Sequence, residues 1–413
     1  MSRRLDVLNT PAHPRYVVWE ITLRCDLACT HCGSRAGPER DDELTTAEAL
    51  EVVPQLAAMG TEEVVLIGGE AYLHDGFLTL VEALASAGIT PTLTTGGRGV
   101  TAELAQAMAA AGMERMSVSI DGLEATHDRM RAYRGSFAAA LAALRHGREA
   151  GLVIGANSNF NRLNRGDLEG LYELFAAEGV RSWQIQLTTP LGRAADRTDL
   201  LLQPYDLLDL VPRIAAVKRR GQAAGMLVMP GNNLGYFGPE EALLRSIEPG
   251  GREHWQGCQA GRFVLGIESN GAVKGCPSLQ TDHYVGGHLR DASLATIWNE
   301  APELAFTRQR GVEDLWGFCK TCPFAATCLG GCSFTAHAIL GRPGNNPYCH
   351  YRARDFDKRG LRERLLPLAP AKGTPFDNGT FEVVVEAKDC PEPRADLPPE
   401  ALVQITRRPE RRR

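Results

Sequence analysis

Apolar and polar positions alternate in a regular order along the first half of the chain. Thr45 and Thr101 mark helix starts, and glycines such as Gly60 and Gly88 mark helix ends. Short apolar runs predict strands at residues 16–23, 62–67, 89–94, 115–120, 152–159 and 182–188. Amphipathic stretches predict helices at residues 45–58, 77–87, 101–111, 136–150 and 167–178, and a further one near 203–224. Repeated βα units predict a parallel sheet, either an incomplete βα barrel or a doubly wound sheet, with ligands at the carboxyl ends of its strands.

This pattern ends near residue 225, and the rest of the chain has a different composition. The short-period, cysteine-rich part leaves little room for a conventional core, which metal clusters could replace. The last part holds one predicted strand at 381–387 and an arginine-rich end that we interpret as a solvated tail. We therefore expect an N-terminal segment (1–15), a barrel (16–228), a connector rich in Gly and Pro (229–251), a cysteine-rich domain (252–355) and a C-terminal extension (356–413).

Composition narrows the classes of protein that the chain can belong to. With 44% apolar and 23% charged residues it is an ordinary globular chain, and the net charge of −5 argues against a nucleic-acid or anionic-membrane partner. No apolar run is long enough to span a membrane, and the start lacks the apolar region of an export signal. We expect a cytoplasmic protein, in which the 11 cysteines bind metal or do redox work rather than form disulfides.

Three cysteines lie directly after the first predicted strand, where a βα sheet places its site. Cys25, Cys29 and Cys32 have the spacing C-x3-C-x2-C and can wrap one metal centre. Either zinc, with His31 or His74 as a fourth ligand, or an iron–sulfur cube with one open iron fits this spacing.

The second predicted strand ends in a short motif that adds to this pattern. In Gly68-Gly69-Glu70 the glycines let the backbone approach a ligand closely, and the carboxylate can accept hydrogen bonds from an ammonium group.

With these motifs, residues 16–225 resemble the radical SAM superfamily. The resemblance implies an α/β fold, a partial (β/α)6 TIM-like barrel. Cys25, Cys29 and Cys32 would hold a [4Fe–4S] cluster whose open iron chelates S-adenosylmethionine (SAM). Such enzymes cleave SAM reductively to a 5′-deoxyadenosyl radical, which abstracts hydrogen from a substrate.

The same resemblance implies SAM contacts along the carboxyl ends of the strands. Gly68, Gly69 and Glu70 would hold the methionine ammonium group, although Ala71 follows where proline is commoner. A helix cap and a surface ion pair would also explain Asp121 and Arg131. The remaining expected contacts are His31 against adenine, Ser119, Asp121 and Arg131 for ribose and carboxylate, and Asn157, Asn159 and Gln186 for ribose and adenine.

Seven further cysteines are spaced like the SPASM extension of many radical SAM enzymes, although two zinc ribbons would also fit them. The resemblance implies a small cysteine-rich domain with two auxiliary iron–sulfur clusters of the [4Fe–4S] type. One cluster has no assigned fourth ligand; Cys390 could serve, but we favour a free thiol. The first cluster would be held by Cys319, Cys322, Cys328 and Cys349, and the second by Cys258, Cys276 and Cys332.

Enzymes similar to this chain act mostly on peptides or proteins, so we expect an oxidoreductase-type peptide maturase. The leading hypothesis is maturation of a ribosomally synthesised peptide by a crosslink, epimerisation, excision or related C–H chemistry. Pro277 follows Cys276 where a sulfatase-modifying enzyme has an aspartate base, which argues against that activity. Candidate proton donors and acceptors are Tyr72, His74, Asp282, His283 and Tyr284.

Three kinds of partner are expected. They are a precursor peptide, a reductase, flavodoxin or ferredoxin as electron donor, and a separate leader-binding protein, because only 15 residues precede the first strand. Two alternatives remain open. One is radical SAM modification of a tetrapyrrole or small metabolite, and the other is a zinc-stabilised binding protein without catalysis.

Overall fold

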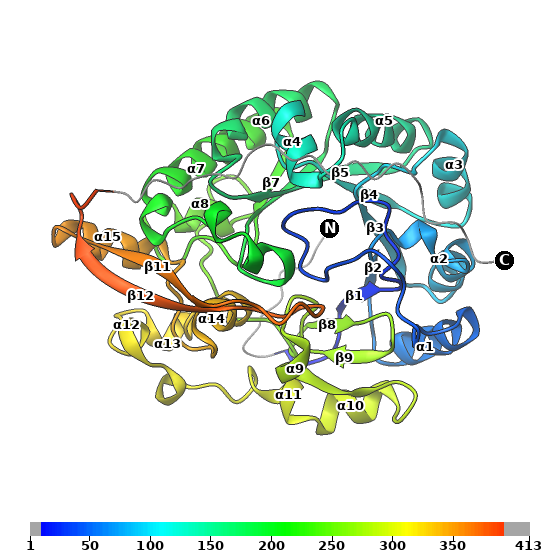
Figure 1. Ribbon diagram of the computed structural model, residues 1–413. Coiled ribbons are helices and arrows are strands. Elements are labelled where there is room, and N and C mark those ends of the chain that lie inside the picture. Colours follow the sequence, from blue (N-terminus) through cyan, green and yellow to red (C-terminus); the bar gives the residue numbers. More distant parts are fainter. Residues whose placement is uncertain (1–9, 392–413) are drawn as a thin grey trace.

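The computed structural model describes residues 10–391 (Figure 1). The predictions for the first nine residues and for the arginine-rich end fall outside this range. A curved sheet forms the centre of the molecule, with helices around its outer side (Figure 1). Within residues 10–391, every helix is too short or too polar to span a lipid bilayer.

The sheet has the strand order β10-β9-β8-β1-β2-β3-β4-β5-β6-β7. Its first seven strands are parallel, β8 adds in parallel beside β1, and β9 and β10 continue it antiparallel. The edge strands are β7 and β10, so the barrel is partial, as predicted. The strands are β1 (Tyr16–Glu20), β2 (Glu63–Ile67), β3 (Thr90–Thr95), β4 (Arg115–Ser119), β5 (Val153–Phe160), β6 (Ser182–Leu187), β7 (Leu227–Pro230), β8 (Val264–Ile267), β9 (Ala272–Lys274) and β10 (Val285–His288).

Six of the seven long helices of the barrel lie at predicted positions, and the helix at Glu124–Arg131 was not predicted. At the first helix, Thr45 Oγ1 accepts a hydrogen bond from Glu48 N at 3.2 Å, and Glu48 Oε2 accepts one from Thr45 N at 2.8 Å, which together form a capping box. Its apolar face packs into the main core. These helices are α1 (Thr46–Ala58), α2 (Phe77–Ser86), α3 (Ala102–Ala110), α4 (Glu124–Arg131), α5 (Ser136–Glu149), α6 (Leu168–Ala177) and α7 (Leu207–Ala224).

Beyond the barrel the helices are short. Leu294, Ile297 and Trp298 nevertheless join the main apolar core, so the expectation that metal clusters replace a core in this part is wrong for these residues. The helices are α8 (Glu241–Arg245), α9 (Thr281–Tyr284), α10 (Leu294–Glu300), α11 (Pro302–Ala305), α12 (Gly317–Lys320), α13 (Ala325–Cys328), α14 (Ser333–Leu340) and α15 (His350–Lys358).

Five strands of the described chain were not predicted, namely β7, β8, β9, β10 and β11. The seventh parallel strand, β7, lies where the pattern was expected to end, and the predicted connector contains its last residues and α8. The C-terminal extension forms a two-stranded antiparallel hairpin of β11 (Leu361–Ala369) and β12 (Thr380–Ala387), of which only β12 was expected.

The loop of this hairpin, residues 370–379, reaches the loop that carries the first three cysteines. Phe376 N donates to Gly33 O at 3.0 Å, and Arg35 Nε lies 2.9 Å from Asp377 Oδ1. On its other side, the Phe376 ring lies beneath Lys274, whose Nζ is 3.8 Å from the ring centroid. The hairpin therefore ties the end of the described chain to its first loop.

Alternate residues of the parallel strands face opposite sides of the sheet. One set, which includes Val17, Trp19 and Leu66, packs against the helices as the main core. The other set faces the inside of the barrel and is largely polar, which leaves a hollow lumen rather than the packed interior of a closed barrel. A cavity of about 190 Å³ in this lumen is lined by Tyr16, Glu63, Val65, Thr92, Leu93, Thr94, Arg115, Ser117, Val153, Gly155, Asn157, Ser182 and Gln184.

Candidate functional site

The loop between β1 and α1 brings three thiols together at the carboxyl ends of the strands. Cys25 N donates to Gly37 O at 2.8 Å, and Cys32 N donates to Cys29 O at 3.3 Å. Burial, Glu70 and the thiols of Cys29 and Cys32 raise the pKa of Cys25 well above its ordinary value. Buried thiols that raise one another's pKa become thiolates when a metal centre supplies positive charge, which suits an iron–sulfur cluster.

The two glycines after β2 press against the start of this loop. A Cβ on Gly68 would lie 2.3 Å from Thr22 O, and one on Gly69 would lie 2.3 Å from Arg24 O. Gly69 N and Glu70 N donate to these two carbonyl oxygens at 2.7 and 2.8 Å. The close approach that we expected toward a ligand is thus made to residues 22–24, and it sets Glu70 beside Cys25. Whether the glycines also contact SAM stays a prediction.

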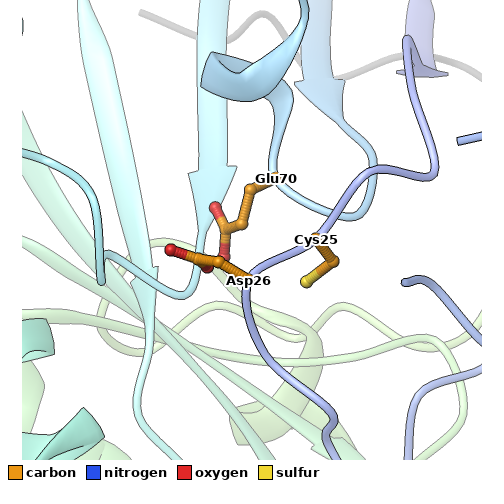
Figure 2. Close-up of side chains that lie close together, drawn as sticks. All are labelled: Cys25, Asp26 and Glu70. Atoms are coloured by element: carbon orange, nitrogen blue, oxygen red, sulfur yellow. The ribbon is translucent and has the colours of Figure 1, made fainter. Parts of the chain in front are cut away.

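Glu70 shares a buried space with Cys25 and Asp26 (Figure 2). One ligand atom from each of these residues lies within 4.8 Å of the others. Glu70 accepts hydrogen bonds from the Thr95 hydroxyl and, at 2.7 Å, from Gly96 N. Burial and the nearby Asp26 raise the pKa of Glu70 to about 8, so the site favours a bound cation. An ammonium group such as that of SAM could donate hydrogen bonds to these carboxylate oxygens.

Asp26 was missed by the sequence reasoning. The Tyr72 hydroxyl donates to both of its carboxylate oxygens at 3.4 Å, and Arg98 donates to its carbonyl oxygen. Burial, Glu70 and Asp26 raise the pKa of Tyr72 well above its ordinary value, so its phenol stays protonated. Tyr72 therefore acts here as a hydrogen-bond donor that holds Asp26. The only signal in the sequence was its place directly after Cys25.

His31, Asp121 and Arg131 form a buried group that contacts Cys29. Asp121 Oδ2 lies 2.6 Å from Arg131 Nη2 and 3.2 Å from His31 Nε2. Arg131 Nη1 donates to Cys29 Sγ at 3.5 Å. Although burial acts in the opposite direction, Arg131 and His31 hold the pKa of Asp121 well below its ordinary value.

This group still has atoms left for a ligand. Arg131 Nε and His31 Nδ1 are buried and have no hydrogen-bond partner within the described chain. Two unsatisfied buried nitrogens beside the thiols fit a bound polar molecule such as SAM. The alternative that Arg131 pairs on the surface is wrong, since its side chain is buried.

The remaining predicted SAM contacts lie on strands β4, β5 and β6. Ser119 is in register with Asn157, and Asn159 with Gln186, so all four share one face of the sheet. Asn157 lines the lumen cavity, and its Nδ2 lies 3.5 Å from Thr94 Oγ1. These side chains therefore lie inside the barrel, and their contact with SAM stays a prediction.

Four of the later cysteines line one small apolar cavity of about 20 Å³ between α12, α13 and α15. Burial is the largest cause of the raised pKa of each thiol. Phe237, Phe318, Phe324 and Tyr351 close the cavity. The structure thus brings together the set expected to hold one auxiliary cluster, Cys319, Cys322, Cys328 and Cys349.

The other three cysteines of the second set also interact. Burial and then Cys258 raise the pKa of Cys276 to about 12 and that of Cys332 to about 11. Cys258 packs into both small apolar clusters of this part, which contain Trp255, Tyr236 and Tyr284. Cys390 follows β12, where its carbonyl oxygen accepts a hydrogen bond from Arg362 at 2.8 Å.

The other candidate proton donors and acceptors are scattered. His74 Nδ1 accepts from Gly76 N at 3.1 Å, and Asp282 forms an exposed ion pair with Lys372 at 2.6 Å. The Tyr284 hydroxyl lies 2.9 Å from Nδ1 of His337, a residue that was missed, and the His283 ring lies 4.8 Å from the His337 ring. The structure does not bring these candidates together into one catalytic group.

Comparison with known proteins places this geometry in a family. The profile of the radical SAM superfamily matches residues 19–175, and that of the SPASM iron–sulfur cluster-binding domain matches residues 258–323. An AdoMet-dependent heme synthase of Methanosarcina barkeri is 28% identical over 349 residues, which cover 82% of this chain and 97% of that protein. The mycofactocin maturase MftC of Mycobacterium ulcerans is 29% identical, with 81% of this chain and 88% of that protein covered.

The fold is also found among solved structures. The crystal structure of Streptococcus suis SuiB bound to S-adenosylmethionine superposes with a TM-score of 0.63 at 16% identity, covering 78% of this chain and 74% of that one. The profiles cover the two cysteine-bearing parts of this chain separately, in the order that the motifs predicted. This chain belongs to the radical SAM superfamily, carries a SPASM domain, and is an enzyme that uses SAM and iron–sulfur clusters.

Proposed function

We propose that this enzyme abstracts hydrogen from a peptide and so matures a ribosomally synthesised peptide. The observation that carries the proposal is the lumen. Its volume of about 190 Å³ lies below the roughly 300–1,000 Å³ of pockets that enclose a drug-sized ligand. This narrow part inside the barrel accommodates one residue of a chain more readily than a macrocycle.

The chemistry of the lumen supports a peptide as well. Glu63 and Arg115 pair at 2.8 Å, and Thr92 donates to Glu63 at 3.1 Å, so these charges satisfy one another. The hydroxyl and amide groups of Ser117 and Gln184 complement peptide N–H and C=O groups. A tetrapyrrole with several carboxylates would need cations that are not already paired.

The residues at the carboxyl ends of the strands have separate tasks in this proposal. When bound, the cluster and SAM supply a carbon radical able to take hydrogen from an unactivated C–H bond. Cys25, Cys29 and Cys32 would hold the cluster, and Glu70 with Asp26 would accept hydrogen bonds from the ammonium group. Arg131, close to Cys29, would offset negative charge at the thiolates.

The relatives support two substrate classes. Similarity to a mycofactocin maturase agrees with a peptide partner. Similarity to an AdoMet-dependent heme synthase over 97% of that protein favours a tetrapyrrole as the second candidate. An electron donor and a separate leader-binding protein remain part of the proposal. A zinc-stabilised protein without catalysis is no longer an alternative, because the chain is an enzyme of an iron–sulfur family.

A side-by-side comparison of the two candidate substrates tests the proposal. The reconstituted enzyme is incubated anaerobically with SAM, reductant and either the precursor peptide encoded beside its gene or iron coproporphyrin III. We expect 5′-deoxyadenosine and a mass change with the peptide, and neither with Cys29→Ala. A mass change of the porphyrin alone would establish the second candidate, and no change in either would overturn both.

A further inference from the structure

A second, larger hollow lies at the opposite end of the barrel from Cys25 and Glu70. This groove, of about 700 Å³, is walled on one side by the first residues of β1, β2, β3 and β4. The other side of the groove is formed by segment 253–259, which contains Cys258. The groove contains Tyr16, Glu63 and Arg115, which also line the lumen. The lumen therefore opens into the groove at the amino-terminal ends of the strands.

The mouth of the lumen at the amino-terminal ends of the strands exposes apolar side chains, of which Tyr16 also lines the groove. Tyr16 is 38% exposed and Val153 is 48% exposed, and both are among the few large apolar residues with such exposure in the described chain. Both line the lumen cavity. Apolar surface that is left open at a cavity mouth is typical of a place where another molecule binds.

The walls of the groove combine apolar surface, amides and charges, most of which are paired, while the Glu114 carboxylate has no ion-pair partner among the described residues. Trp255 and Phe263 supply apolar surface, and Arg15 pairs with Glu62 at 2.7 Å. Arg245 lies over the Trp255 ring at 5.1 Å and pairs with Glu241 at 3.2 Å. Side-chain amides come from Asn232, Gln256 and Gln259. This surface suits an extended peptide segment that is neutral or weakly basic, because it offers apolar contacts, hydrogen bonds and the carboxylate of Glu114.

We propose that the groove binds the part of the peptide that flanks the modified residue. The substrate then reaches the lumen from the amino-terminal ends of the strands, and SAM binds at the other end. This inference rests on the proposed function and adds to it a binding site and a direction of approach. It also places the flanking segment beside Cys258, at the border between the barrel and the SPASM domain.

Closing the mouth tests this inference. Val153→Trp places a large ring at an exposed position, where it fills the mouth without entering the main core. Val385→Trp is the matched control, since Val385 is 52% exposed on β12, outside the groove and the lumen. Asn232→Trp narrows the groove itself and provides a second variant. Iron content and circular dichroism establish that each variant folds and holds its clusters.

The readouts are KM and kcat for the precursor peptide and the anisotropy of the same peptide labelled with fluorescein. We expect Val153→Trp and Asn232→Trp to raise KM and Kd at least tenfold with a smaller change in kcat, and Val385→Trp to change none of them. If the wild-type enzyme modifies the peptide and the KM of both Val153→Trp and Asn232→Trp stays within twofold of the wild-type value, this inference alone is overturned. A wild-type enzyme that neither binds nor modifies the peptide would overturn the proposed function and this inference together.

Discussion

Glu70 has two hydrogen-bond donors in the structure, the Thr95 hydroxyl and Gly96 N, and it shares its space with a second carboxylate, that of Asp26. Two carboxylates this close and this deeply buried are stabilised by a cation between them. We therefore expect the negative charge of Glu70, more than the shape of its side chain, to determine how strongly it binds an ammonium group.

Replacing Glu70 with glutamine keeps the size of the side chain and removes its charge. We expect Glu70→Gln to weaken SAM binding by about tenfold to a hundredfold, since a hydrogen bond to a charged group contributes about 1.5–3 kcal/mol. Anaerobic equilibrium dialysis of the reconstituted enzyme with radiolabelled SAM measures this. Glu82→Gln, at an exposed position of α2, is the control and should bind like wild type. Equal affinity of both variants would contradict the assigned role.

Glu20, at the end of β1, predicts a pH dependence of stability. Burial, together with Glu268, raises its pKa from 4.5 to about 8, although Arg40 lowers it. Between these two values the folded protein holds a proton that the unfolded chain has lost. The free energy of unfolding therefore falls as the pH rises through this window, by up to about 1.4 kcal/mol per pH unit.

Glu20→Gln removes this titration. We expect its melting temperature, measured anaerobically by calorimetry, to fall less than that of wild type between about pH 5.5 and about pH 7.5, by a few degrees. Glu51→Gln, at an exposed position of α1, should keep the wild-type slope. If Glu20→Gln kept the full wild-type slope, another group would have to be responsible.

At the scale of the element, the C-terminal hairpin is held to α15 by one buried ion pair. Arg352 Nε and Nη2 each donate to a Glu363 carboxylate oxygen at 2.6 Å, and Arg352 Nη1 donates to Asn345 Oδ1 at 2.6 Å. Arg352 lies in the first turn of α15, and Cys349 is the residue directly before that helix. The hairpin is thereby connected to a cysteine of the SPASM domain.

Breaking this pair on the hairpin side should destabilise the protein strongly. Glu363→Gln leaves a buried guanidinium without its countercharge, which typically costs about 3–5 kcal/mol. We expect a lower urea midpoint and faster loss of iron to a chelator, both measured anaerobically. Glu382→Gln, exposed on β12 of the same hairpin, should behave like wild type. A wild-type midpoint for Glu363→Gln would show that the pair does not anchor the hairpin.

The sequence predicted the six longer parallel strands because each carries a clear apolar run between helix signals. It missed β7 because LVMP is only four residues long and ends in proline. It missed β11 because Arg362, Glu363 and Arg364 interrupt the apolar pattern and Pro367 argues against a strand.

Residues of the candidate site that belong to a sequence motif were predicted. Residues that reach the site only through the folding of distant segments were missed. Cysteine spacing and the Gly-Gly-Glu motif singled out Cys25 and Glu70, which the structure places close together. Arg98 meets Asp26 from 72 residues further along the chain, in a loop without periodicity. Tyr16 lines the lumen and the groove because its face of β1 points into the barrel. The sequence of one strand does not show which face lies on the inner side of the curved sheet.

At the scale of the whole molecule, the barrel and the SPASM domain differ in what stabilises them. Strands β2 to β5 lie in the main core, while α12 and α13 are helices of four residues each. Helices of this length are not stable on their own, and four cysteines surround the cavity between them. The iron–sulfur cluster expected there would take the place of a packed core.

Removal of iron should therefore loosen one part of the molecule and spare the other. After anaerobic chelation we expect amide hydrogen exchange to rise at least tenfold in residues 317–332 and to stay near wild type in β2 to β5. Hydrogen exchange with mass spectrometry, with and without iron, measures both regions in one sample. Equal loss of protection in the two regions would mean that they unfold as one unit.

The contact between the hairpin loop and the cysteine loop has a consequence for biosynthesis. Arg35 and Asp377, which join these loops, are 342 residues apart. At a translation rate of about 5–20 residues per second, the ribosome needs on the order of tens of seconds to make the chain between them. The contacts that fasten the cysteine loop to the hairpin loop can therefore form only after nearly all of the described chain has been made.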